Sequence, residues 1–242
     1  KINVVSNFRD NDIINGGQGA PLTPIFHYYL TKRIKRKICF INLGGISNVT
    51  YFDHKNKTNL KNILAFDAGP CCSLIDDWVN QNSNKKFDNF GLLARKGDVK
   101  EKIIKNFLKN PFFSKLPPKS LDRSLFSLKM LKKLEIKDGA ATLNYFVAET
   151  LSMAINYLPE IPDVCILSGG GRRNKFLVEL INKKIKKSKI LLSENYNWDG
   201  DSIEAYAFAY LSVRKLLNLP ITFSKTTGVK RPLVGGQIFT FI

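Results

Sequence analysis

The chain has 242 residues, of which 44% are hydrophobic and 24% are charged, and its formal net charge is +18. This length suits one large domain or two small ones and is enough to bury a core. No apolar run approaches the ~20 residues of a membrane span and no secretory signal opens the sequence, so we expect a cytoplasmic protein without membrane contact.

The positive charge allows nucleic-acid binding, but the pattern of the lysines favours solvated faces. They occur in scattered runs such as KRIKRK, NKKIKKSK and LKKLEIK, without the interleaved aromatic residues of single-strand binders. A basic nucleic-acid binder remains an alternative, and it would bind DNA with an affinity that falls steeply with salt. The four cysteines form no CxxC pair, which points to a reducing cytosol.

The first third of the chain predicts strands and one short helix. A strand at 2–5 and a glycine-rich turn precede a helix at 21–30, with Pro21 in its first turn. Two β-rich runs, 37–43 and 46–52, are separated by Gly44-Gly45 and predict a hairpin. A third strand at 62–67 is broken by Gly69-Pro70, and a helix follows at 72–81.

The middle of the chain, 85–137, reads as helices with loops. Apolar spacing predicts helices at 99–108 and 124–134, and the prolines keep 110–120 extended. A long helix at 138–158 follows, with Asp138 as its N-cap. The last third alternates. Its elements are a strand at 163–167, a glycine turn, a helix at 175–186, a strand at 189–193, a helix at 201–218 and a tail of loop and extended chain.

This order predicts an α/β fold with a ribonuclease-H-like sheet, in which three antiparallel strands are followed by two parallel ones with crossover helices on both faces. Two such lobes make the actin-like ATPase fold of sugar kinases and heat-shock ATPases. We expect residues 37–242 to form one complete C-terminal lobe with a helical insertion at about 85–137. Residues 1–36 would be a remnant of the N-terminal lobe and the inter-lobe segment. Because the chain begins with Lys in mid-pattern, we expect a fragment or a processed form.

The chain resembles the anhydro-N-acetylmuramic acid kinase family of bacterial cell-wall recycling. The matching stretches are collinear and span nearly the whole chain: FRDNDIINGGQGAPLTPIFH (8–27), NLGGISNVT (42–50), FDAGP (66–70), PPKSLDRSLF (117–126), KDGAATL (137–143), LSGGGRRN (167–174), DSIEAYAFAYLSVR (201–214) and TFSKTTG (222–228). Three features depart from the family: Asn7 replaces Asp, DAGPCC replaces DTGPGN, and the upstream GTS-x-DG phosphate loop is absent.

The resemblance implies a kinase that uses ATP, with Mg²⁺ implied by phosphoryl transfer. Water would open the 1,6-anhydro bridge of the amino sugar at C1, and the freed O6 would take the γ-phosphoryl group. A homodimer is possible, because the family is commonly dimeric. The alternative is a truncated, non-catalytic remnant that binds sugar or nucleotide, which the missing loop and Cys71-Cys72 favour.

Two motifs have both a local and a functional interpretation. Asp67 follows an apolar strand and precedes a Gly-Pro turn, so its carboxylate could cap the next helix or act as a general base. Gly44 and Gly45 could be a plain hairpin turn or could bring backbone N–H groups to phosphates. The resemblance implies the catalytic role for Asp67 and nucleotide binding for both glycines.

The turn of Gly169, Gly170 and Gly171, with Asn174 at the next helix start, lacks the dinucleotide-binding spacing. It could be a crowded corner, and the resemblance makes it the adenosine side of a nucleotide cleft.

Three more residues are candidates for sugar binding. Glu204 could be an exposed charge near a helix start, or it could contact the sugar. Arg9 could form a surface salt bridge or bind the lactate carboxylate of the sugar. Gln18 belongs to the same matched block, as does His27, for which a structural role is favoured.

Overall fold

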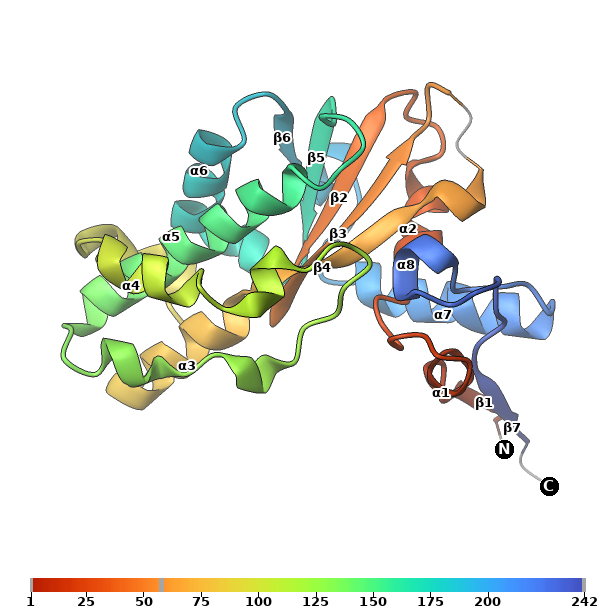
Figure 1. The fold of residues 1–242 in the computed structure, drawn as a ribbon, viewed down its shortest axis with the longest axis horizontal. Helices are drawn as coiled ribbons and strands as arrows, with labels where there is room; N and C mark the ends of the chain where they lie inside the picture. Colours follow the sequence, from red (N-terminus) through yellow and green to blue (C-terminus); the bar gives the residue numbers. More distant parts are fainter. Residues whose placement is uncertain (1, 57–58, 241–242) are drawn as a thin grey trace.

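The computed structural model of this protein describes residues 2–56 and 59–240, and a single five-stranded sheet forms its centre (Figure 1). Its strand order is β4-β3-β2-β5-β6, and the strands are β2 Lys37–Leu43, β3 Ile46–Asp53, β4 Leu64–Pro70, β5 Val164–Ser168 and β6 Lys189–Leu192. Strands β2, β3 and β4 pair antiparallel, whereas β5 pairs parallel with β2 and β6 parallel with β5. The predicted ribonuclease-H-like order of strands is therefore confirmed.

Alternating side chains along the strands divide the core between the two faces of the sheet. In β2, for example, Cys39 and Ile41 face one side, while Ile38 and Phe40 face the other. Four helices pack on the first face: α3 Cys72–Asn82, α4 Glu101–Phe107, α5 Ile136–Ile155 and α6 Lys175–Lys184. The second face is covered by α2 Pro24–Thr31 and α7 Ile203–Leu216.

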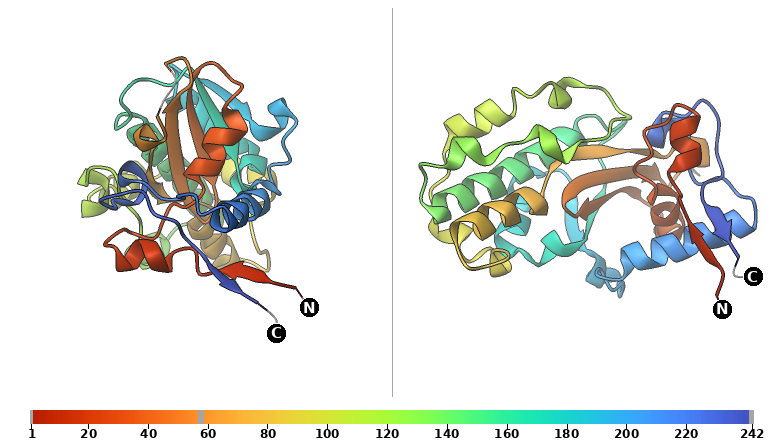
Figure 2. Two further views of the ribbon diagram at one scale, coloured as in Figure 1. Left: turned by 90° about the vertical axis from the view of Figure 1, so that its right-hand side faces the viewer. Right: turned by 90° about the horizontal axis from the view of Figure 1, so that it is seen from below.

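The two ends of the chain meet beside α7. Strand β1, Val4–Ser6, pairs antiparallel with β7, Gln237–Phe239, and Figures 1 and 2 show this ribbon projecting with both termini. Asp12 in helix α1, Asp10–Ile14, ties the ends together, because its buried carboxylate accepts hydrogen bonds from Gly19 N and Thr227 Oγ1, both at 2.7 Å. Thr227 ends the short helix α8, Ser224–Thr227, which lies in the tail that we expected to be loop and extended chain.

The helix expected at 124–134 is wrong. This segment consists of two short 3-10 turns, Arg123–Leu125 and Leu128–Leu131. The side chains of Asp122 and Ser127 accept hydrogen bonds from backbone amides two residues further on, at 2.9 and 3.3 Å. Such local bonds favour caps and turns over a continuous helix. A further 3-10 turn, Pro111–Ser114, interrupts the expected extended stretch.

Several element boundaries also differ from expectation, three of them near the candidate site or its core. Helix α5 starts at Ile136 after Glu135, so Asp138 lies in its first turn and accepts a hydrogen bond from Asp98 N at 2.9 Å instead of capping. Helix α2 starts at Pro24, not at Pro21. Strand β4 continues to Pro70, which an edge strand tolerates because one side needs no backbone donor.

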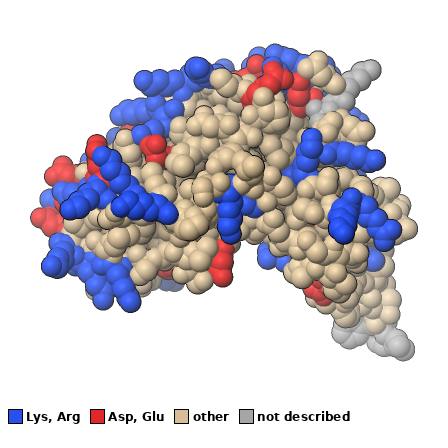
Figure 3. Space-filling model, viewed as in Figure 1, with Lys and Arg blue, Asp and Glu red and all other residues tan. Residues whose placement is uncertain are grey.

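On the face shown in Figure 3, Lys and Arg side chains occupy several separate places. Among the described residues, no helix is long and apolar enough to cross a membrane.

Candidate active site

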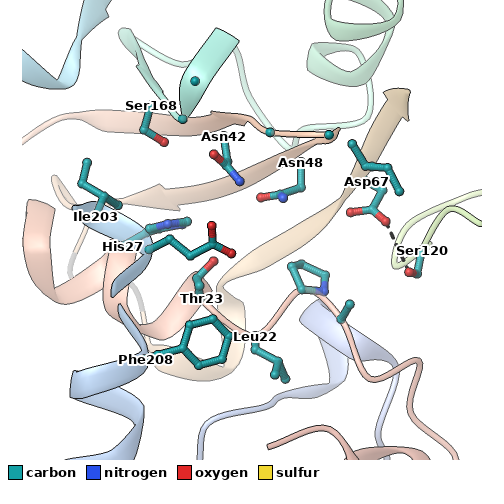
Figure 4. Close-up of a pocket in the computed structure, with 18 of the residues that line it drawn as sticks. Leu22, Thr23, His27, Asn42, Asn48, Asp67, Ser120, Ser168, Ile203 and Phe208 are labelled. Carbon is teal, nitrogen blue, oxygen red and sulfur yellow. Dashed lines mark hydrogen bonds between the residues drawn. The ribbon is translucent and has the colours of Figure 1, made fainter. Parts of the chain in front are cut away.

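A row of polar side chains crosses four strands near one end of the sheet. Asp67 lies opposite Asn48, Asn48 opposite Asn42, and Asn42 opposite Ser168. The row belongs to the face that α2 and α7 cover, since its members alternate with the residues that point into the other core. All four line a cavity of about 440 Å³ (Figure 4).

Asp67 lies at one end of this row with its carboxylate largely buried. Its Oδ2 accepts hydrogen bonds from Leu121 N at 2.8 Å and, more weakly, from Ser120 Oγ at 3.3 Å, the contact dashed in Figure 4. Burial raises the pKa of Asp67 to about 6, against the opposing effect of these two donors and of the positive charge of Arg9. A carboxylate with this pKa is ionised at neutral pH and is a stronger base than an ordinary one.

The hairpin tip between β2 and β3 presents backbone N–H groups near the same cavity. The carbonyls of Gly44 and Gly45 accept hydrogen bonds from the first amides of α3, Cys72 N and Cys71 N, both at 3.0 Å. In a trans peptide the C=O and the following N–H point in opposite directions. The N–H groups of Gly45 and Ile46 are therefore turned away from α3, and both residues line the cavity.

The glycine turn after β5 lies beside the hairpin tip and must be glycine at two positions. Gly169 has φ +77°, and a Cβ there would lie 2.4 Å from Asn42 Oδ1. A Cβ on Gly171 would lie 2.7 Å from Cys72 Sγ, whereas one on Gly170 would meet nothing within 4 Å. The crowded-corner interpretation thus holds for Gly169 and Gly171, while Gly170 lies open.

A second cavity, of about 830 Å³, lies on the far side of this turn. Gly170, Gly171 and Asn174 line it, together with the exposed rings of Phe87 and Phe90. Asn174 does not offer its side chain freely. Its Oδ1 caps α6 by accepting from Leu177 N at 3.0 Å, and its Nδ2 donates to Asn144 Oδ1 at 2.8 Å.

Arg172 cross-links the segments that separate the two cavities. Its buried guanidinium donates to Gly169 O at 2.9 Å, to Glu194 Oε1 at 2.7 Å and to Asp201 Oδ1 at 2.8 Å. Asp201 and Gly170 line both cavities. One buried side chain therefore links the glycine turn to the segment that starts α7.

The opposite wall of the first cavity brings Arg9 and Glu204 together with Thr23 and Phe208 (Figure 4 labels the last two). His27 also reaches this wall, but it is buried, stacks on Phe40 at 4.1 Å between ring centroids and contacts Thr50 Oγ1 at 3.1 Å. Burial lowers the pKa of His27 to about 3, so the ring is neutral, which fits a structural role.

Gln18 does not line either cavity, so the structure does not bring it to the other candidates. Its Nε2 donates to Pro118 O at 2.9 Å, and its backbone N–H donates to Thr227 O at 2.9 Å.

Sequence reasoning assigned no role to Asn42, Asn48 or Ser168. Their signal is the alternation along each strand, since Asn42 continues the Ile38, Phe40 series at the end of β2. Lys119, Ser120 and Leu121 were also given no role, although they lie in the matched stretch 117–126. The motif does not show that they contact Asp67, because these contacts depend on how a distant loop packs.

Comparisons with known proteins agree on one family. The family model described as anhydro-N-acetylmuramic acid kinase matches residues 1–241. A protein of that name from Zymomonas mobilis is 42% identical over 238 residues, which cover 98% of this chain and 64% of the relative. Another from Rhizorhabdus wittichii is 40% identical, covering 97% of this chain and 63% of the relative. The chain thus spans less than two thirds of these curated relatives.

Among solved structures, the activator of 2-hydroxyisocaproyl-CoA dehydratase from Clostridium difficile, with bound ADPNP, aligns at a TM-score of 0.46 and 16% identity, covering 78% of this chain and 66% of the other. A ROK family glucokinase from Streptomyces griseus, in complex with glucose and AMPPNP, aligns at a TM-score of 0.40 and 12% identity, covering 78% of this chain and 65% of the other.

Proposed function

Because this chain belongs to the anhydro-N-acetylmuramic acid kinase family, we propose that it is the larger part of an enzyme that converts 1,6-anhydro-N-acetylmuramic acid, ATP and water into N-acetylmuramic acid 6-phosphate and ADP. The observation that carries this proposal is the position of Asp67, a buried carboxylate with its pKa raised to about 6, in the cavity that the hairpin-tip amides also line.

Asp67 acts as the general base. It takes a proton from a water molecule whose oxygen attacks C1 of the sugar, and the bond between C1 and O6 breaks. The freed O6 attacks the γ-phosphorus of ATP, and ADP leaves. Since a well-placed base contributes roughly 10²- to 10⁴-fold to a rate, loss of this carboxylate should dominate all other single changes.

The sugar binds between the polar row and the wall opposite. Arg9 pairs with the lactate carboxylate, for which a guanidinium fork is well suited, and Glu204 contacts the sugar hydroxyl groups. Gln18 acts indirectly, through its bond to Pro118 O. The N-terminal part of the relatives, outside this chain, would complete the site.

The nucleotide lies across the wall between the cavities. The amides near Gly44 and Gly45 face the transferred phosphate, and oriented N–H groups of this kind bind anions. The turn of Gly169, Gly170 and Gly171 lies on the adenosine side, with Asn174 holding the start of α6. The cavity with Phe87 and Phe90 receives the base.

Magnesium enters as part of the Mg–ATP substrate. Such an ion is held mainly by phosphate oxygens and water and needs only one or two carboxylates. Within residues 2–56 and 59–240, no group of three or more His, Cys, Asp and Glu side chains is placed to hold a metal.

We also propose that residues 37–242 form the C-terminal lobe of the enzyme. We propose further that the protein is located in the cytosol and that its activity does not require nucleic acid. The four cysteines, Cys39, Cys71, Cys72 and Cys165, are free thiols, in keeping with a reducing compartment. A homodimer remains a prediction.

The experiment is ADP release by the purified chain with ATP, Mg²⁺ and 1,6-anhydro-N-acetylmuramic acid, beside Asp67→Asn and the control Asp122→Asn on an exposed loop. We expect sugar-dependent release that only Asp67→Asn abolishes. If neither the chain nor the full-length protein releases ADP with sugar, the proposal fails. If only the full-length protein does, the chain alone is a non-catalytic binding unit, which is the alternative function.

A further inference from the structure

A short loop segment, Pro118–Leu121, runs along the free edge of β4, and we call it the strap. Strand β4 is an edge strand, so its outward N–H and C=O groups need partners. The N–H of Asp67 donates to Lys119 O at 2.9 Å, and the N–H of Leu121 donates back to Asp67 Oδ2 at 2.8 Å. The strap therefore both covers the carboxylate and supplies its hydrogen-bond donors.

The side chain of Lys119 crosses to the other face of the sheet. It is 5% exposed, and its ammonium lies 4.5 Å from the ring centroid of Tyr157, 4.7 Å from that of Phe112 and 6.0 Å from that of Phe66. Its Nζ also donates to Phe112 O at 3.2 Å. Phe66 is the neighbour of Asp67 in β4 and points to the opposite face. The strap therefore contacts both faces of this strand, through Leu121 N at Asp67 and through Lys119 at Phe66.

A buried ammonium is costly, and here no carboxylate within the described residues compensates for it. Burial is the cause that lowers the pKa of Lys119, to about 8. An apolar side chain of similar length would fill the same space without this desolvation. An apolar side chain could not donate a hydrogen bond to Phe112 O or make cation–π contacts with three rings. The charge of Lys119 therefore fixes the position of the strap.

We propose that Lys119 is a positioning residue for Asp67. Lys119 anchors the strap so that Leu121 N and Ser120 Oγ meet the carboxylate and the strap shields that side of it from bulk water. This inference rests on the proposed role of Asp67 as the base. Lys119 acts through the backbone, because its ammonium and the carboxylate lie on opposite faces of β4. The bond from Gln18 Nε2 to Pro118 O holds the strap from its other end.

Other charged groups face the same cavity and must be kept constant in any test. Arg9 on the segment before α1 lowers the pKa of Asp67, whereas Glu204 and Asp201 approach from α7 and the loop before it. His27 from α2 is buried and neutral at neutral pH. None of these touches Lys119, so a Lys119 variant changes the strap without changing them.

The test is the titration of the Asp67 carboxyl carbon by ¹³C NMR in the 242-residue chain, assigned with Asp67→Asn. We compare Lys119→Met, Lys119→Arg and the exposed control Lys115→Met. Burial is the largest cause of the raised pKa, so a loosened strap should let the pKa fall from about 6 towards its ordinary 3.8. We expect a fall of about one unit or more in Lys119→Met, together with faster amide hydrogen exchange at Leu121. Lys119→Arg and Lys115→Met should both match the parent.

An unchanged Asp67 pKa and unchanged Leu121 exchange in folded Lys119→Met would overturn the proposal. If that variant does not fold, Tyr157→Leu removes the nearest ring, and the same shifts are expected from it; their absence would have the same meaning. Neither readout requires activity. The proposed function fails if neither the chain nor the full-length protein releases ADP, and the pKa and exchange measurements test the role of Lys119 in either case. In an active protein, Lys119→Met should lower kcat and leave the KM for ATP unchanged.

Discussion

Asp67 and Asn48 lie opposite each other on β4 and β3, yet their side chains differ in how they are satisfied. Asp67 Oδ2 has Leu121 N and Ser120 Oγ as donors, whereas the buried Asn48 Oδ1 has no hydrogen-bond partner among the described residues. A buried acceptor without a donor costs about 1–3 kcal/mol. Since Asn48 lines the cavity beside the proposed base, the proposed function predicts that a hydroxyl group of the sugar or the attacking water donates to it.

Asn48→Ala should therefore separate activity from stability. We expect sugar-dependent kcat/KM to fall about tenfold or more, the value of one lost hydrogen bond, while the thermal midpoint stays the same or rises. Steady-state kinetics and thermal unfolding check this, with the exposed Asn80→Ala in α3 as control. A large drop in thermal midpoint without any kinetic effect would make Asn48 a structural residue.

Asp67→Asn should change how stability depends on pH. The pKa of Asp67 is about 6 in the folded chain and 3.8 ordinarily, so folding disfavours its ionised form. The parent therefore has its full stability below about pH 4 and loses some as the pH rises through 6. A difference of about two pKa units corresponds to a loss of about 3 kcal/mol at most in the free energy of unfolding. The variant has no ionisable group at this position and should not show this loss. Denaturant unfolding at pH 4 and pH 7.5 should show that the stability of the variant relative to the parent increases with pH. Parallel profiles would mean that Asp67 is not buried as described.

The glycine turn offers a matched pair of substitutions. Gly169→Ala forces a Cβ to 2.4 Å from Asn42 Oδ1 at a positive φ, so we expect a loss of about 1–3 kcal/mol in unfolding free energy. Gly170→Ala meets open space and should be stable within about 0.5 kcal/mol. If a nucleotide contacts Gly170, Gly170→Ala should also weaken ATP binding, which calorimetry measures. Equal losses of stability in both variants would contradict the described turn.

Arg9→Ala should raise KM only for substrates that carry the lactate carboxylate. A charge-assisted pair contributes about 1.5–3 kcal/mol, so KM for 1,6-anhydro-N-acetylmuramic acid should rise about tenfold or more. For the corresponding anhydro-N-acetylglucosamine, which lacks the lactyl group, the KM values of parent and variant should be alike, whereas kcat can change for both sugars because Arg9 also lowers the pKa of Asp67. The two substrates are compared in the same ADP-release assay. An equal effect on both would assign Arg9 to another part of the sugar.

Asp12→Ala should loosen the junction of the two chain ends. Its buried carboxylate accepts from Gly19 N and Thr227 Oγ1, and both donors would lose their partner. We expect a loss of about 2–4 kcal/mol in the free energy of unfolding, against almost none for the exposed neighbour in Asp10→Ala. Denaturant unfolding measures both. Similar behaviour of the two variants would show that the junction does not contribute to stability.

Sequence patterns predicted the sheet because its signal is local. Runs such as 37–43 and 46–52 have β-branched and aromatic residues and a Gly-Gly turn between them, and β2 and β3 follow these bounds within one residue. The segment 124–134 shows the limit of such patterns. Its apolar spacing suits a helix, but Asp122 and Ser127 bond to nearby amides and divide it into turns.

The sequence by itself determined the order of the strands and, through its resemblance, the family. It named Asp67, Arg9, Glu204 and the glycines 44, 45, 169 and 170 as candidate site residues beside local alternatives, and all of them line the first cavity. Only the tertiary structure decided that Asn42, Asn48 and Ser168 form one row with Asp67, that Gln18 lies outside the cavity, and that Lys119 holds the strap. Cross-strand register and loop packing join residues about a hundred positions or more apart, as Gln18 and Pro118 are. No local pattern of hydrophobicity or turn residues encodes such contacts, since they form only when the separate elements pack together.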